Sequence, residues 1–237
     1  MRRAGTVLGV VALVLAAAAL LLLLAAGPGT RFGWWGFRTG LGLLRWVAYG
    51  ALAGAALGLI GLVLGGARTA AAIALVLGLA AFAVPWTFQR RARSVPPIHD
   101  ITTDTEDPPR FVAVLERRAG AANAPEYEGA KVAAQQKTAY PDIAPIALPD
   151  PPERAFEKAL AAARSLGWEI VAAEPKDGRI EATDTTRWFG FKDDVVIRVR
   201  PAGAGSRIDV RSESRVGRSD VGANAARIRR FRTALGA

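Results

Sequence analysis

The chain contains no cysteine and a single histidine, His99. Without thiols, the protein forms no disulfide bond, zinc–thiolate site or iron–sulfur cluster, and it has no cysteine nucleophile. A single imidazole also excludes every site that needs two histidines. The motifs typical of serine hydrolases, nucleotide-binding loops and zinc proteases are missing as well, so the sequence gives no support for these chemistries.

Acidic side chains are absent from the first 93 residues, which carry nine arginines and no lysine. The whole chain has 31 basic and 21 acidic residues, so residues 94–237 hold 22 basic and 21 acidic side chains. The net charge of +10 therefore belongs almost entirely to the N-terminal region. Because the remaining part of the chain is close to neutral, we expect no nucleic-acid partner.

Three long apolar runs predict transmembrane helices over residues 5–26, 41–65 and 69–88, within a membrane region of residues 1–93. A helix rises about 1.5 Å per residue, so the shortest of these runs is sufficient for a hydrocarbon core of about 30 Å. Aromatic side chains, which favour the headgroup zone, lie at the run ends: Trp34, Trp35, Trp46, Tyr49, Trp86 and Phe88. No run has an acid, a histidine or an amide in its interior, so we do not expect transport.

The orientation in a bacterial inner membrane stays open at this point. With the N-terminus inside, three arginines flank the spans on the cytoplasmic side and six on the outer side, which favours the reverse arrangement. The Arg2-Arg3 pair before the first run favours a cytoplasmic N-terminus instead. We interpret this run as a retained anchor, because it is longer than the apolar part of a signal peptide and no clear cleavage site follows it.

Small residues recur at intervals of four in the second run, at Gly50, Gly54 and Gly58. Such a stripe lets helix backbones approach closely. It is compatible with an oligomer face, or with packing of the second span against the third. We favour the second interpretation.

Residues 94–152 contain ten of the 14 prolines and show little periodicity. Proline fixes φ and removes a hydrogen-bond donor, so this segment is predicted to be extended or looped. Phe111, Tyr127 and Tyr140 are unusual in a disordered linker. We therefore expect part of the segment to pack on the domain that follows.

Residues 153–237 predict an α+β domain with the element order α-β-β-β-β-α. A first helix begins after Asp150-Pro151-Pro152 and ends at Gly167. Alternation of apolar and polar residues, as in 195–199, predicts a four-stranded antiparallel meander with one buried face. The apolar spacing in residues 219–235 predicts a last amphipathic helix that covers the sheet.

Four sequence blocks carry a resemblance to a known family: residues 98–104 (IHDITTD), 140–143 (YPDI), 211–217 (RSESRVG) and 220–224 (DVGAN). In their order and spacing they resemble the bacterial and plastid family catalogued as domain of unknown function 1499, over about residues 96–235. The resemblance implies a membrane-associated or exported protein, and it implies no activity. It also favours an extracytoplasmic position for the soluble domain.

Residues 211–237 hold seven arginines and two acids, whereas residues 94–210 hold 15 basic and 19 acidic side chains. This imbalance predicts a surface that binds an anionic group through guanidinium contacts. The residues expected to converge on a ligand, or to assist there, are Asp100, Asp104, Asp142, Arg211, Ser212, Arg215, Asp220, Asn224 and Arg227. The alternative, which we favour for the arginine cluster as a whole, is a solvated helix face whose arginines balance the acidic remainder of the domain.

His99, Asp100 and Asp104 offer ligand types that several metals accept. Asp and Thr at these spacings before Asp107-Pro108 are also typical of Asx turns, and we favour this structural interpretation. No catalytic residue, metal ligand or cofactor is therefore assigned.

Together these patterns predict a multi-pass protein of the bacterial cell envelope, embedded in the lipid bilayer. We expect its soluble domain to be a non-catalytic binding or assembly module for a partner protein or an anionic amphipathic ligand. The alternative is a metal-assisted or carboxylate-based hydrolase that uses His99, Asp100 and Asp104. The sequence does not decide whether the protein is an enzyme, and it favours that it is not.

Overall fold

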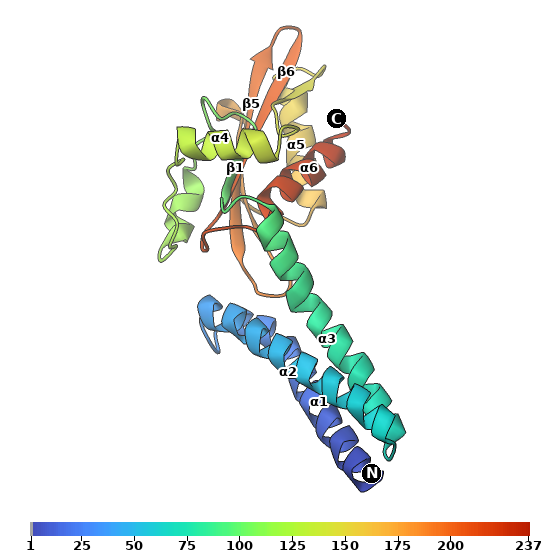
Figure 1. The fold of residues 1–237 in the computed structure, drawn as a ribbon. Helices are drawn as coiled ribbons and strands as arrows, with labels where there is room; N and C mark the ends of the chain where they lie inside the picture. Colours follow the sequence, from blue (N-terminus) through green and yellow to red (C-terminus); the bar gives the residue numbers. More distant parts are fainter. Residues whose placement is uncertain (1) are drawn as a thin grey trace. The chain divides into compact units, whose positions relative to one another are not determined.

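The structure is a computed structural model that describes residues 2–237 (Figure 1). The chain forms two compact units. The first contains the N-terminal region up to Arg91 together with the short loop 187–190. The second contains residues 92–186 and 191–237.

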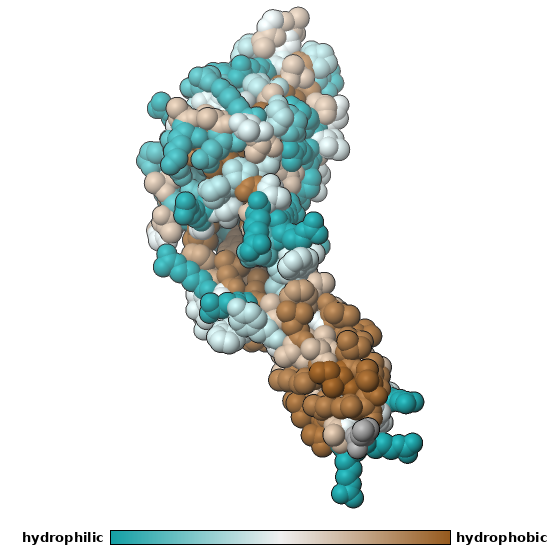
Figure 2. All heavy atoms as spheres, viewed as in Figure 1, coloured by the Kyte–Doolittle hydropathy of each residue, from teal (hydrophilic) through white to brown (hydrophobic). Residues whose placement is uncertain are grey.

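Three long helices form the N-terminal region: α1 (Arg2–Arg31), α2 (Phe37–Leu64) and α3 (Arg68–Ser94). Each is long and apolar enough to cross a membrane, and apolar side chains dominate the surface of this unit in Figure 2. Val14 and Leu21 are more than 60% exposed, a state that lipid favours and water does not. The prediction of three apolar spans is confirmed, and it indicates a membrane-associated protein.

The glycine stripe of α2 lies between helices of the same unit. A Cβ added to Gly54 would lie 2.9 Å from the backbone nitrogen of Ala16 in α1. One added to Gly58 would lie 2.7 Å from the carbonyl oxygen of Ala71 in α3. The small residues therefore allow the close approach of both neighbouring helices within one chain. A role of this stripe in an oligomer stays a prediction.

A six-stranded antiparallel sheet forms the centre of the second unit, with the order β1-β6-β5-β4-β3 and with β2 also paired to β6. Its strands are β1 (Asp100–Thr102), β2 (Ile146–Leu148), β3 (Glu169–Glu174), β4 (Arg179–Thr185), β5 (Lys192–Ala202) and β6 (Gly205–Ser214).

The predicted four-stranded sheet is wrong in its number of strands. The meander itself is present as β3 to β6, each strand paired with the next. The two additional strands come from the proline-rich segment, and each pairs only three residues with β6. Three residues are too few to show the period of a strand, which is why alternation did not predict them.

The helices of this unit are α4 (Ala130–Ala139), α5 (Pro152–Ser165) and α6 (Ala223–Leu235), with short 3-10 turns η1 (Ala113–Arg118) and η2 (Pro175–Asp177). As predicted, α5 begins with proline and is followed by Gly167, whose φ of +77° favours glycine. Helix α6 begins later than expected. The Asp220 carboxylate accepts the N–H groups of Gly222 (2.7 Å) and Asn224 (2.8 Å), so residues 219–222 form a turn before the helix.

The apolar core lies between the sheet and helices α5 and α6, which cover the same face (Figure 1). Alternate residues of β5, Val195, Ile197 and Val199, point into it as predicted. The rings of Trp168 and Phe231 stack there, 5.6 Å apart.

The opposite face of the sheet is buried too, contrary to the predicted single buried face. Residues 104–127, which we call the covering segment, contact this face. Phe111 and Val114 pack there on Val196. Most other side chains of this second face are charged, and they form the candidate site.

Candidate functional site

Strand alternation places charged residues on the second face of the sheet. Asp194 of β5 and Asp209, Arg211 and Glu213 of β6 are each at most 2% exposed. An unpaired buried charge costs several kcal/mol, so each of these groups needs close partners. The structure supplies such partners from neighbouring strands, from β1 and from the covering segment.

Arg211 pairs with Asp100, as expected for two residues of one site. Its Nε lies 3.0 Å from Asp100 Oδ1 and its Nη2 lies 2.8 Å from Asp100 Oδ2. Nη2 also donates to the Pro125 carbonyl (2.8 Å) and lies 3.3 Å from Glu213 Oε2. Burial raises the pKa of the Asp100 carboxyl, and Arg211 only partly offsets this effect.

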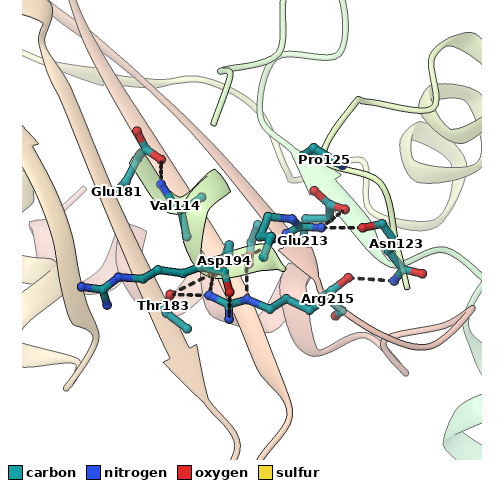
Figure 3. A network of polar contacts seen from close by, with 12 residues as sticks. Val114, Asn123, Pro125, Glu181, Thr183, Asp194, Glu213 and Arg215 are labelled. Atoms are coloured by element: carbon teal, nitrogen blue, oxygen red, sulfur yellow. Dashed lines mark hydrogen bonds and ion pairs between the residues drawn. The ribbon is translucent and has the colours of Figure 1, made fainter. Parts of the chain in front are cut away.

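Arg118 joins the covering segment to two strands. Its guanidinium lies 2.8 Å from Asp194 and 2.8 Å from Glu213 (the network of Figure 3). The Asp194 carboxylate also accepts two hydrogen bonds from Arg215, at 2.9 and 2.8 Å, and one from the Thr183 hydroxyl, at 2.8 Å. Burial, followed by the nearby Asp100 charge, raises the pKa of Glu213 to about 8, against the opposing effect of Arg118 and Arg211.

Glu181 of β4 fixes the covering segment at a second point. Its fully buried carboxylate accepts the backbone N–H groups of Val112, Ala113 and Val114 at 3.0, 3.0 and 2.9 Å. Figure 3 shows the bond with Val114. These N–H groups belong to the start of η1, where a negative charge is favoured. Arg179 contacts the same carboxylate.

Asp104 lies in a separate charged group on the same face. It contacts Arg207 at 2.6 Å and Arg198 at 3.2 Å, and it accepts the N–H groups of Glu106 (3.1 Å) and Asp107 (3.0 Å). The backbone contacts are the predicted Asx turn. Burial acts to raise the pKa of Asp104, but these hydrogen bonds and arginines outweigh it and lower the pKa.

Ser212, Asn224 and Arg227 lie on the other face, where α6 covers the sheet. The Ser212 hydroxyl donates to Asn224 (2.8 Å), and Asn224 donates to the carbonyl of His99 (2.8 Å). Arg227 is 2% exposed and pairs with Asp184 at 2.8 Å and Asp193 at 2.5 Å. These residues, with Asp220 at the helix start, attach α6 to the sheet.

The nine residues expected to converge therefore fall into separate groups. Asp142 belongs to none of these groups. It pairs with the half-exposed Arg229, at 2.6 and 2.7 Å. Arg229 lowers the pKa of Asp142. Whether any of the nine residues binds a ligand stays a prediction.

The side chains of His99, Asp100 and Asp104 do not form one cluster. The His99 Nε2 lies 3.3 Å from Glu128, whereas the two aspartates contact different arginines. Within residues 2–237, no group of three or more histidine, aspartate or glutamate side chains is arranged to hold a metal ion.

The sequence arguments missed four residues of this site: Arg118, Glu181, Asp194 and Glu213. A signal for one of them, Glu213, is present at the end of β6, where Arg211, Glu213 and the following Arg215 alternate with serines. Charges at a period of two predict a charged face, and the aromatic residues of the preceding segment predict a cover over it. Arg118 carries no such local signal, because its partners lie 76 and 95 residues further along the chain.

A pocket of about 510 Å³ opens beside Arg211, between β6 and the covering segment. Apolar atoms of Pro108, Phe111, Leu115 and Pro125 line it, together with the ring of Tyr127. Its polar lining consists of Arg110, Glu126 and Arg211. The Arg211 guanidinium lies 4.7 Å from the centre of the Phe111 ring and 5.7 Å from that of Tyr127.

The comparison with known families identifies the second unit. Residues 100–235, more than half of the chain, match the family described as "Protein of unknown function (DUF1499)", and the chain belongs to this family. This confirms the resemblance drawn from the sequence blocks. The three long helices precede the matched region. No curated protein and no solved structure matches the chain.

Proposed function

We propose that this membrane-associated protein is a non-catalytic binding module, which holds an anionic amphipathic ligand at the surface of a cell membrane. The observation that carries the proposal is the pocket beside Arg211, where an apolar lining meets arginine side chains. Ligand sites are usually concave and mostly apolar, with a few polar groups that fix orientation. A partner protein as the occupant is the alternative that the experiment below addresses.

The contacts of the acidic residues support binding over hydrolysis. A general base or a metal ligand needs a carboxylate oxygen that faces the substrate or the metal. Asp100 instead directs both oxygens to Arg211, and Asp104 accepts backbone N–H groups and two arginines. These carboxylates therefore act on the domain's own structure, and we assign the function to binding.

The proposed location is the bacterial inner membrane, with the soluble domain outside the cytoplasm. The Arg2-Arg3 start before α1 and the family's implied export support this orientation, against the arginine count of the flanks. A C-terminal alkaline phosphatase fusion should be active, and a C-terminal green fluorescent protein fusion dark. The reverse pair of results would place the domain in the cytoplasm.

Purified full-length protein in a neutral detergent tests the binding proposal against the hydrolase. Native mass spectrometry should reveal a non-covalent small molecule that is released chemically unchanged, and metal analysis should give the same trace content for wild type and His99→Ala. The variant Asp177→Asn, an exposed carboxylate elsewhere in the domain, serves as the control. One metal per chain that is lost in both His99→Ala and Asp104→Asn would establish the hydrolase alternative. A chain without any bound small molecule would contradict the proposed ligand and favour a protein partner or a spacer.

A further inference from the structure

We infer that the pocket beside Arg211 binds the anionic head group of an amphiphile through Arg110 and the Nη1 group of Arg211, with the apolar tail against Phe111 and Leu115. This inference rests on the proposed binding function and adds which residues of the pocket hold the head group and which hold the tail of the ligand. Three observations carry it: donors without acceptors, the apolar lining, and the charge balance beneath the pocket.

Several hydrogen-bond donors of the residues that line the pocket have a weak partner or none. The Nη1 group of Arg211 makes only a 3.5 Å contact with the Pro109 carbonyl, the longest hydrogen bond of this side chain. Arg110 lines the pocket, is exposed, and has no ion pair in the part of the chain that the structure describes. The hydroxyl of Tyr127 is buried without a hydrogen-bond partner among residues 2–237. A ligand that supplies several acceptor oxygens, such as a phosphate or a carboxylate, matches these donors.

The same pocket offers an apolar surface for a tail. Leu115 lines it and is 42% exposed, although leucine is a residue that water disfavours. The volume of about 510 Å³ lies within the range of about 300–1,000 Å³ that small-molecule sites have. A free inorganic anion would leave this surface in contact with water, whereas an acyl or alkyl chain would cover it.

The charged layer beneath the pocket favours a negative ligand. It sets three guanidinium groups against three carboxyl groups: Arg118, Arg211 and Arg215 against Asp100, Asp194 and Glu213. Because burial raises the pKa of Glu213 to about 8, this carboxyl is mostly protonated near pH 7 and the layer carries an excess positive charge. Among residues 2–237, Glu126 is the only acid that lines the pocket, and it is exposed to solvent.

The test uses the full-length protein in nanodiscs of zwitterionic lipid and three soluble probes. Dihexanoyl phosphatidic acid is an anionic amphiphile, dihexanoyl phosphatidylcholine has the same chains and a zwitterionic head group, and inorganic phosphate has no chain. We expect phosphatidic acid to bind about tenfold more tightly than each of the others, as one charge-assisted hydrogen bond predicts. Anionic lipid is then added to the disc. If it displaces the soluble phosphatidic acid, the natural ligand is a bilayer lipid, and if it does not, the natural ligand is a soluble amphiphile.

Two exposed side chains provide variants that leave the fold intact. Arg110→Gln should weaken phosphatidic acid binding about tenfold, and Glu126→Gln should strengthen it, because it removes a repelling charge. Arg164→Gln, an exposed arginine of α5 outside the pocket, removes the same charge and should change nothing. Leu115→Gln should weaken binding of both lipid probes and leave phosphate unaffected.

Equal affinity for the two lipid probes, or affinities insensitive to Arg110→Gln and Glu126→Gln, would overturn the inference. Phosphate binding as tight as that of phosphatidic acid would overturn the amphiphile as ligand, and so would the absence of binding by all three probes. None of these results decides the proposed function, which fails instead when the purified chain carries a stoichiometric metal or no small molecule.

Discussion

Arg118 is the residue whose removal tests most directly how the charged face works. The substitution Arg118→Met keeps an unbranched apolar stem and removes the guanidinium that lies 2.8 Å from both Asp194 and Glu213. The arginine and both carboxylates are at most 4% exposed in their side chains, so water cannot replace the lost contacts. Removal of one partner from a buried ion pair costs about 3–5 kcal/mol.

Two features place the expected loss near the lower end of that range. Asp194 keeps its two bonds with Arg215 and its bond with Thr183, and Glu213 is already mostly protonated near pH 7, since its pKa is raised to about 8. We therefore expect the free energy of opening of the covering segment to fall by about 3 kcal/mol. This corresponds to an increase of about 100-fold in the hydrogen-exchange rate of its amides.

Hydrogen-exchange mass spectrometry of the full-length protein measures this change in peptides that contain Val112 and Val114, whose amides are bonded to Glu181. The matched control is the neighbouring Arg117→Met, because Arg117 is half-exposed and its pair with Glu169 is worth at most about 1 kcal/mol. Exchange in Arg118→Met that stays within a few-fold of the control would refute the claim that the ion pairs hold the covering segment.

Three further predictions follow from the same contacts. The folded-state pKa of Glu213 is about 8, whereas the ordinary value is 4.5. Between pH 4.5 and pH 8 the unfolded chain therefore binds fewer protons than the folded one, so the free energy of unfolding falls as pH rises through this range. Urea unfolding of wild type and Glu213→Gln at pH 5 and pH 8 should therefore show a smaller loss of stability in the variant, and equal losses would contradict the assigned pKa. Gly58→Leu places a side chain against the backbone of Ala71 and should lower the melting temperature in detergent, whereas Gly42→Leu, which meets open space, should not. Asp142→Asn breaks only a half-exposed pair with Arg229 and should change the free energy of unfolding by less than about 1 kcal/mol, and a larger loss would show that Asp142 has a role in the core.

The fold was predictable wherever one residue type repeats with a clear period. The three apolar runs are long enough to be unambiguous, and the structure extends them into α1, α2 and α3. The strands of the meander and helices α5 and α6 also follow their periodicity. By contrast, β1, β2 and α4 lie in the proline-rich segment, where tertiary contacts rather than local pattern decide the structure. Gln136 of α4, for example, bonds both the N–H and the carbonyl of Thr102 in β1.

The candidate site was predictable only in part, for a related reason. The sequence singled out Asp100 and Arg211, which do pair, because both lie in blocks rich in polar residues. It could not show that Asp104, Asp142 and Asn224 contact different partners, since residue spacing does not reveal which face of a sheet or helix a side chain occupies after folding. Arg118 and Glu181 were missed because each acts on a segment far away in the sequence.

The buried charges also explain how the pocket acquires a fixed shape. Ion pairs of this kind add little stability compared with apolar residues of the same volume, but each has few geometries in which all its donors and acceptors are satisfied. Glu181 fixes the covering segment at residues 112–114 and Arg118 fixes it at a second point. Phe111 directly precedes the first point, and Leu115 lies between the two. The pocket walls from the covering segment are therefore positioned against Arg211 by groups that do not line the pocket themselves. A preorganised wall lowers the entropy lost on binding, so under the proposed function a charged face that contributes little to folding would contribute to ligand affinity.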